Sequence, residues 1–203
     1  MPFNKLHPHL QETLAELEIT EPTPLQEKVI PIIKSGSNVY CTAPKDSGKT
    51  TTLILTTLQK LKCEAAGNAP RAVVLVENKE RALELYDLFL TYTRYTSLRV
   101  YVGHEHLHVD VQKSEIFMGI DILISTPKSM NTLFLLNGVP ISQLKIFSID
   151  DAKFLVKKSA FAALISIAQS IQKCQYVIYS EEMSTKLERF DAHFMEHSKK
   201  ITV

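Results

Sequence analysis

The stretch "NVYCTAPKDSGKTTTLILTTLQKLK", residues 38–62, decides the fold class. It begins as a short run of β-branched and aromatic residues, passes through a loop that ends in Gly48-Lys49-Thr50, and continues with helical periodicity. A loop between a strand and a helix places the backbone N–H groups of Ser47 to Thr50 at a helix N-terminus, where they would bind an anion. The stretch therefore predicts a strand, a phosphate-binding loop and a helix, in that order.

The same alternation continues along the chain. Short apolar runs occupy residues 38–43, 72–77, 98–103, 121–126, 144–150, 175–180 and 199–203. Helix-period segments occupy residues 48–62, 79–92, 127–136, 161–172 and 185–197. Near-continuous apolar strands that alternate with helices indicate an α/β three-layer domain: a mostly parallel sheet, helices on both faces, and a ligand site at the carboxyl ends of the strands.

The first 35 residues differ from the rest. A helix-period segment, residues 9–18, is followed by Pro22, Pro24 and Pro31, which interrupt the pattern. We expect residues 1–35 to form an N-terminal extension packed on a domain of residues 36–203. Within that domain, the small-residue loop "CEAAGNAPR", residues 63–71, is the segment we expect to be most flexible.

Composition restricts the class of protein. A chain of 203 residues, 45% of them hydrophobic, can fill one core, and a formal net charge of +1 means that any nucleic acid would be bound through a local patch. Three widely spaced cysteines, Cys41, Cys63 and Cys174, fit neither a disulfide framework nor a paired metal site. The N-terminus lacks the basic-then-apolar pattern of a secretory signal, and no apolar stretch approaches the ~18 residues of a membrane span. We therefore expect a soluble cytoplasmic protein.

The loop residues suggest roles in binding a nucleotide. The Lys49 ammonium would bridge the β- and γ-phosphates, and the Thr50 hydroxyl would be a ligand of Mg²⁺, which prefers oxygen. Asp46 opposes this, because a carboxylate ~4 Å from a phosphate oxygen costs up to roughly 4 kcal/mol at an effective dielectric constant of 20. A left-handed backbone at Asp46 and the neighbouring Lys45 would offset that cost. A loop that only caps a helix, through Asp46 or Ser47, is the alternative.

Six segments in order resemble the motifs of the first RecA-like domain of DEAD-box RNA helicases. They are "EPTPLQ" (21–26), "APKDSGKT" (43–50), "VENKERA" (76–82), "STPKSM" (125–130), "SIDDAKFL" (148–155) and "YSEEM" (179–183). The resemblance covers nearly the entire chain and implies a RecA-like P-loop fold, ATP and Mg²⁺ as cofactors, and RNA as a ligand. It implies that Gln26 reads adenine and that Phe3 is the upstream aromatic residue that stacks on it. The positions that would hold the nucleotide are Gln26, Ala43, Asp46, Ser47, Gly48, Lys49 and Thr50.

The resemblance also assigns catalytic and metal positions. Asp150 would hold Mg²⁺ through water, together with Thr50 and the nucleotide. Asp151 stands where the family has the glutamate that positions the attacking water, and it is one methylene shorter. Since water activation depends on placement to within ~0.5 Å, this change predicts a large loss of rate. A structural pair of Asp150 and Asp151 at a strand end, without a metal, is the alternative.

Other family positions are altered. Lys79, Gly103, Thr126 and Pro127 occupy RNA-contacting positions, although only Glu80 and Ala82 match the family's P-T-R-E-L-A and the arginine of T-P-G-R is Ser129. Lys153 replaces the last aspartate of the catalytic motif, and Ser180 is followed by Glu181 and Glu182 where the family has Ala-Thr. In the family these positions couple ATP to RNA. We expect Lys153 to pair with Glu181 or Glu182 as a structural lock in place of a switch.

Two histidine patterns are weaker candidates for metal sites. His104, His106 and His108 alternate, and on an extended strand they would face one way and could bind a transition metal. A solvated loop, or a pH-dependent contact to a nucleic-acid backbone, is the alternative. "HFMEH", residues 193–197, matches H-x-x-E-H on an expected helix near the end of the chain, where we expect no zinc site.

The residues therefore predict an ATP-binding and RNA-binding helicase-like domain with a compromised hydrolytic site. Unwinding by this chain alone is not expected, because the second RecA-like domain, which supplies the arginines that complete the ATP site, is absent from the sequence. A separate second RecA-like domain or another protein would be its partner. The rival prediction is a non-catalytic interaction scaffold derived from a helicase domain. A third is a true helicase whose natural gene continues beyond Val203.

Overall fold

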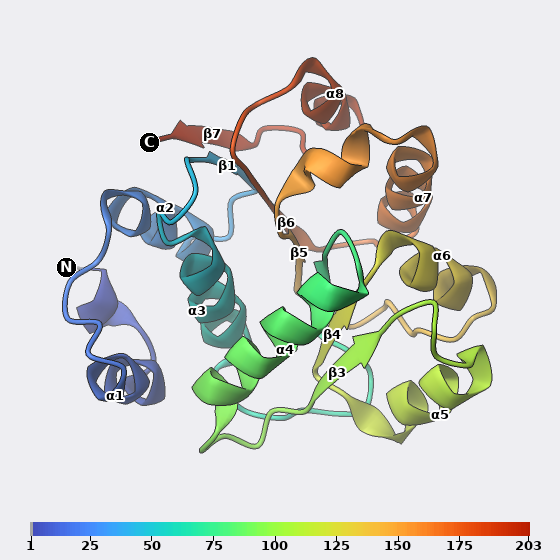
Figure 1. Ribbon diagram of the computed structural model, residues 1–203, viewed down its shortest axis with the longest axis horizontal. Helices are drawn as coiled ribbons and strands as arrows, with labels where there is room; N and C mark the ends of the chain where they lie inside the picture. The colour runs from blue at the N-terminus through green and yellow to red at the C-terminus, as the bar shows by residue number, and fades with distance from the viewer. Residues whose placement is uncertain (1) are drawn as a thin grey trace.

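A computed structural model describes residues 2–203 and shows a seven-stranded sheet between two layers of helices (Figure 1). The strands are β1 (Val39–Thr42), β2 (Ala72–Leu75), β3 (Val100–Gly103), β4 (Ile122–Ser125), β5 (Ile146–Ile149), β6 (Gln175–Ser180) and β7 (Lys199–Thr202). Their order is β3-β4-β2-β5-β6-β1-β7, and every neighbouring pair is parallel. Each strand lies within one of the seven apolar runs, so the predicted α/β three-layer fold is confirmed.

Helices connect the strands and cover both faces. They are η1 (Phe3–Lys5), α1 (Pro8–Glu16), α2 (Pro24–Lys34), α3 (Lys49–Leu61), α4 (Lys79–Thr93), α5 (Val109–Gly119), α6 (Pro127–Leu135), η2 (Ala152–Val156), α7 (Lys158–Gln169), α8 (Thr185–Glu188) and η3 (Arg189–Ala192). One apolar cluster joins one face of the sheet to α1, α2, α3 and α4, and a second joins the other face to α5, α6 and α7. Val74 belongs to the first cluster and Val73 to the second, as expected for a strand buried on both sides. Among residues 2–203, no helix is long and apolar enough to cross a membrane.

Of the three prolines of the N-terminal extension, Pro22 lies in the break between α1 and α2, as the sequence suggested, but Pro24 and Pro31 do not interrupt a helix. Helix α2 begins at Pro24, at a position that needs no N–H donor, and continues through Pro31. Its buried face, which includes Val29, Ile30 and Ile33, packs in the first cluster. Burial of this face outweighs the hydrogen bond that Pro31 cannot donate.

Two elements differ from the sequence prediction. The loop expected after β3 is present at residues 104–108, but helix α5, which follows it, was not predicted. Little of α5 is buried: Gln112 and Ile116 are its buried residues. The helix expected over residues 185–197 is wrong, because α8 ends at Glu188 and the 3-10 helix η3 ends at Ala192. Phe190 and Met195 are both fully buried. On a continuous α-helix these two side chains would point about 140° apart, so the chain has to turn to bury both.

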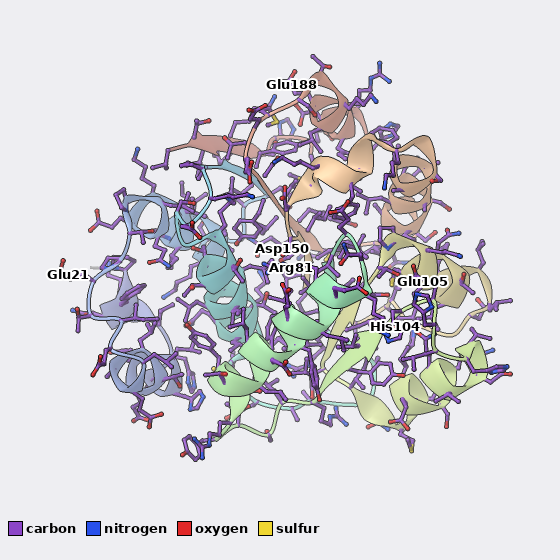
Figure 2. All side chains as sticks on the ribbon, viewed as in Figure 1. Glu21, Arg81, His104, Glu105, Asp150 and Glu188 are labelled. Carbon is purple, nitrogen blue, oxygen red and sulfur yellow. The ribbon has the colours of Figure 1, made fainter. Side chains whose placement is uncertain are left out.

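The carboxyl ends of the parallel strands meet at one edge of the sheet. Asp150 follows β5 at this edge, and Arg81, from the first turn of α4, lies beside it (Figure 2). This is the edge at which α/β domains bind their ligands. The predicted functional segments that directly follow a strand all lie at this edge.

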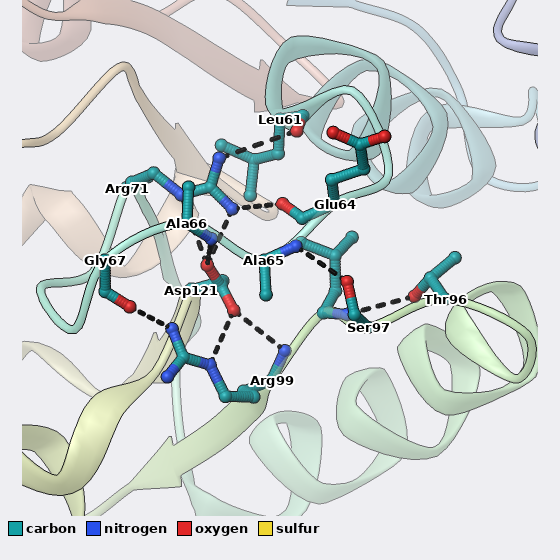
Figure 3. A network of polar contacts seen from close by, with 11 residues as sticks. Leu61, Glu64, Ala65, Ala66, Gly67, Arg71, Thr96, Ser97, Arg99 and Asp121 are labelled. Carbon is teal, nitrogen blue, oxygen red and sulfur yellow. Dashed lines mark hydrogen bonds and ion pairs between the residues drawn. The ribbon is translucent and has the colours of Figure 1, made fainter.

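The opposite edge is held by a buried carboxylate (Figure 3). Asp121, which precedes β4, is fully buried and forms ion pairs with Arg71 at 2.6 Å and with Arg99 at 2.9 Å. It also accepts a hydrogen bond from the backbone N–H of Ala66, and Arg99 donates to the carbonyl of Gly67. These contacts hold Ala66, Gly67 and Arg71 of the loop of residues 63–71, which was expected to be the most flexible segment of the domain.

Candidate nucleotide site

The loop between β1 and α3 has the backbone of an anion-binding turn. Asp46 and Gly48 both have left-handed conformations, with φ of 58° and 90°, and Gly48 is the N-cap of α3. A Cβ at Gly48 would lie 2.9 Å from Gln26 Nε2, so a larger residue would have to displace the Gln26 side chain and would be strained at this φ. The left-handed backbone predicted for Asp46 is present, and its side chain is exposed.

Lys49 begins α3 and folds back over the loop. Its Nζ donates hydrogen bonds of 2.5 Å to the carbonyl oxygens of Ala43 and Pro44. Ser47 also closes the loop, since its hydroxyl donates to Pro44. A phosphate held by the Lys49 ammonium would compete with the two carbonyl oxygens for the same donors.

Helix α2 is fastened to this loop by the segment around Gln26. Thr23 donates its hydroxyl to the Ser47 carbonyl at 2.8 Å, and the Gln26 amide nitrogen lies 3.5 Å from the Gly48 carbonyl. Gln26 is buried, and its amide oxygen accepts from the Thr23 backbone N–H in a capping box. Phe3, the residue suggested for stacking on adenine, is only 6% exposed within the first apolar cluster. This burial disfavours the suggestion, because it leaves little of the ring accessible to a base.

Arg81 is the residue of this site that the sequence did not reveal. It lies in the first turn of α4, where its backbone N–H is capped by the Asn78 side chain. Its Nη2 donates to Thr50 Oγ1 at 3.0 Å and its Nε donates to Asp150 Oδ2 at 2.7 Å. One guanidinium therefore bridges the two residues that were expected to hold Mg²⁺. The only signal in the sequence is that an arginine occupies the leucine position of P-T-R-E-L-A.

The positions predicted to contact nucleic acid gather at the same edge. Lys79 begins α4 after β2, Gly103 ends β3, and Thr126 caps α6 at Pro127 after β4. The Thr126 hydroxyl accepts from the Ser129 backbone N–H, and it donates to Glu105 Oε2 at 2.7 Å.

A pocket of about 480 Å³ lies beside Thr126, and its charges are mixed. Glu77 and Glu105 line it together with Lys128 and Lys157. Burial alone would raise the pKa of Glu105, but hydrogen bonds from its own backbone and from Thr126 outweigh burial and lower the pKa. Glu105 is therefore ionised at neutral pH, and it places a negative charge beside a position where a phosphate would be expected.

Comparison with known proteins identifies the domain. The model of the DEAD/DEAH box helicase family matches residues 23–190. The chain belongs to this family. The match includes the Gln26 segment, the phosphate loop and the strand ends that carry Asp150 and Ser180.

Relatives and a solved structure agree with this assignment. The chain is 26% identical to the probable ATP-dependent RNA helicase ddx52 of Dictyostelium discoideum, over 98% of this chain and 30% of the relative. It is 24% identical to the ATP-dependent RNA helicase DeaD of Buchnera aphidicola subsp. Schizaphis graminum, over 99% of this chain and 33% of the relative. The fold matches Saccharomyces cerevisiae Dbp5, solved with Nup159, Gle1, IP6 and ADP, with a TM-score of 0.85 and 18% identity over 98% of this chain and 52% of that one. The chain thus spans about a third of these curated relatives and carries the N-terminal RecA-like domain of a DEAD-box protein.

The family implies ATP and usually Mg²⁺, but the residues of this helicase domain do not fit Mg²⁺. The ion needs oxygen ligands at about 2.0 Å in near-octahedral geometry. The guanidinium of Arg81 occupies the space between Thr50 and Asp150, where the ion would bind. Burial alone would lower the pKa of Arg81, but its hydrogen bond to Asp150 raises it, so the cation is permanent.

Asp151, at the position of the family's catalytic glutamate, lies in a left-handed backbone with φ of 49°. Its Oδ1 is buried and has no hydrogen-bond partner within the described residues 2–203. A pocket of about 300 Å³ lies beside it, and its other carboxylates belong to Glu77, Glu80, Glu84 and Asp150.

The expected partner of Lys153 is close to it. Lys153 Nζ lies 2.5 Å from Glu181 Oε2, at the exposed edge of the sheet. The hydrogen bond between them raises the pKa of Lys153 and lowers the pKa of Glu181. Ser180 turns away from this pair, since its hydroxyl donates to the Glu182 carbonyl at 2.8 Å.

The histidine patterns do not form metal sites in the described part of the chain. No group of three or more His, Cys, Asp or Glu side chains within residues 2–203 is placed to hold an ion. His104 and His106 lie in the loop after β3, and His108 caps α5, so the three are not aligned on a strand. Burial, with Lys79 and His106 nearby, lowers the pKa of His104. The H-x-x-E-H segment lies in turns and not on a helix.

Proposed function

We propose that this domain binds an adenine nucleotide at the loop between β1 and α3 and hydrolyses ATP slowly or not at all. The observation that carries the proposal is the joining of α2 to that loop. Thr23 and Gln26 contact the backbone of Ser47 and Gly48 directly, so the segment whose Gln26 would read the base lies against a helix N-terminus that carries Lys49. An ordinary helix cap would not need a second helix held against it.

Slow hydrolysis follows from the carboxylates. Asp150 is held by Arg81, and Asp151 is one methylene shorter than the residue that positions water in the family. Arginines from a second RecA-like domain would add a further factor of ~10³ or more in related phosphoryl-transfer sites, and none is present in these 203 residues. We therefore propose that the domain does not unwind nucleic acid by itself.

RNA binding by this domain would be local and weak. Lys79 and the N-terminus of α6 at Thr126 are suited to bind phosphate groups. The carboxylates of Glu77 and Glu105 would repel phosphate groups. The balance of these charges makes affinity dependent on ionic strength, as expected for contacts to a phosphate backbone.

Calorimetric titration with ATP and with ADP tests the nucleotide proposal. Lys49→Ala should weaken binding at least tenfold, because it removes the ammonium that faces the phosphates. Lys28→Ala is the matched control, since Lys28 is exposed on α2 and is not part of the loop. No binding heat at millimolar nucleotide, or equal effects of the two substitutions, would overturn the proposal.

A second candidate is a non-catalytic scaffold, and the Lys153–Glu181 ion pair favours it. This pair joins the catalytic and coupling segments of the helicase fold without any ligand. A scaffold would keep the same conformation with and without nucleotide. Hydrogen exchange of residues 148–155 and 179–183 separates the two functions: protection that rises on adding ATP supports the nucleotide module, and unchanged protection despite binding supports the scaffold.

A further inference from the structure

We propose that the guanidinium of Arg81 replaces Mg²⁺ in this nucleotide site, so that the domain binds nucleotide without a divalent cation. The inference rests on the proposed nucleotide binding and specifies its cation. It starts from the disagreement between the family, which usually uses Mg²⁺, and the residues of this chain.

The first step is the choice of partners. Thr50 and Asp150 lie 100 positions apart in the sequence. What links them is that both stand at positions that hold the metal ion in the family. Arg81 contacts both, at 3.0 Å and 2.7 Å. A side chain that was merely filling space would have no reason to select these two oxygens.

The second step is the charge balance. The side chain of Asp150 is only 5% exposed, and a buried carboxylate needs a cation or several hydrogen bonds to remain ionised. Arg81 supplies a fixed positive charge through a short, charge-assisted hydrogen bond. An entering Mg²⁺ would have to displace a half-buried guanidinium from that carboxylate and leave it next to a second cation.

The third step is the position of Arg81 relative to the phosphates. Thr50 follows Lys49 at the N-terminus of α3, so a phosphate held by Lys49 lies next to a hydroxyl that Arg81 already contacts. Three N–H groups of Arg81 are used by Thr50, Asp150 and Glu84. A guanidinium has further N–H groups for a phosphate, and its fork geometry suits phosphate oxygens.

The test is a titration of the domain with ATP and with ADP in two buffers, one with Mg²⁺ and one with EDTA. Wild-type affinity in EDTA should equal or exceed that in Mg²⁺. Arg81→Leu restores the residue of the family motif, and its affinity should be at least tenfold higher in Mg²⁺ than in EDTA. Arg94→Leu makes the same change on an exposed residue at the end of the same helix and should behave as the wild type.

The outcomes separate the inference from the proposed function. A wild type that binds more than about threefold tighter in Mg²⁺ overturns the inference and leaves nucleotide binding intact. A wild type that does not bind, beside an Arg81→Leu variant that binds in Mg²⁺, also overturns it, because Arg81 would then block the site. Absence of binding by both proteins overturns the proposed function, and the inference with it. If circular dichroism shows that Arg81→Leu does not fold, the wild-type comparison of the two buffers still decides.

Discussion

Replacing Asp46 by glycine should tighten nucleotide binding. Asp46 lies in the phosphate loop at the position where the family motif has a glycine. Its exposed, negatively charged carboxylate would repel the phosphates of a bound nucleotide. The substitution removes that charge without disturbing the backbone, because φ at this residue is already 58° and glycine adopts this conformation freely.

The expected size follows from the exposure of the side chain. Two charges ~4 Å apart repel by about 1 kcal/mol in water and by about 4 kcal/mol at an effective dielectric constant of 20. Asp46 is exposed, so the value near the water limit applies. About 1 kcal/mol corresponds to an increase in affinity of about fivefold. Stability should change by less than about 1 kcal/mol, because relief of the left-handed strain and the greater freedom of unfolded glycine oppose each other.

Calorimetry with ADP at low salt measures the effect, and Asp46→Asn is the control. Asparagine tolerates a left-handed backbone as aspartate does but carries no charge. If repulsion dominates, both variants should bind about fivefold tighter than the wild type, and the gap should shrink as salt is added. A gain for glycine alone would assign the effect to the backbone. Unchanged affinity in both variants would refute the reasoning, since the carboxylate would then lie too far from the phosphates.

Three further predictions concern the buried carboxylate Asp121, the mixed-charge pocket at Glu105 and the exposed ion pair of Lys153 and Glu181. Asp121→Asn should lower the free energy of unfolding in urea by about 3–5 kcal/mol, because it leaves Arg71 buried without its partner. Although burial alone would raise the pKa of Asp121, its hydrogen bonds lower it. The stabilisation by its ionised carboxylate should therefore be complete above about pH 3.9 and decline as the pH falls further. The variant should lack this part of the pH dependence of the free energy of unfolding. Glu105→Gln should tighten RNA binding about fivefold at low salt, measured by fluorescence anisotropy, because one negative charge is removed; equal affinity would show that RNA does not bind at the pocket beside Glu105. Lys153→Ala and Glu181→Gln should each lower the melting temperature slightly, and the double variant no further, whereas additive effects would exclude a coupled pair.

The strands could be predicted from the sequence because both faces of the sheet are buried. Runs such as Ala72–Leu75 have no polar residue and stand out against the helical segments. Helix α5 could not be predicted in this way, since it exposes Val111, Phe117 and Met118 while it buries Gln112. Its apolar residues do not form one stripe, and periodicity is the signal on which such predictions depend.

In the functional site, residues that are adjacent in the sequence could be predicted, and contacts between residues distant in the sequence could not. Gly48, Lys49 and Thr50 are adjacent in sequence, so their motif fixes their place at a helix N-terminus. Arg81 lies 31 positions from Thr50 and 69 from Asp150, and only the order of the strands brings the three together. The contact of Glu105 with Thr126 is equally non-local, at 21 positions. Neither partner could be recognised before the topology was known.

These non-local contacts share a physical consequence for any ligand of the domain. Thr50 is already bonded to Arg81, Thr126 to Glu105, and Lys49 to the carbonyl oxygens of its own loop. A nucleotide or a phosphate backbone therefore has to exchange an intramolecular hydrogen bond for each new one, instead of replacing only water. The apparent affinity equals the intrinsic affinity multiplied by the fraction of molecules in which these bonds are open, so it is lower than the intrinsic value. Arg81 is the exception among them, because its positive charge attracts the phosphates while it holds Thr50. For this reason the nucleotide site should retain binding more readily than the pocket at Glu105.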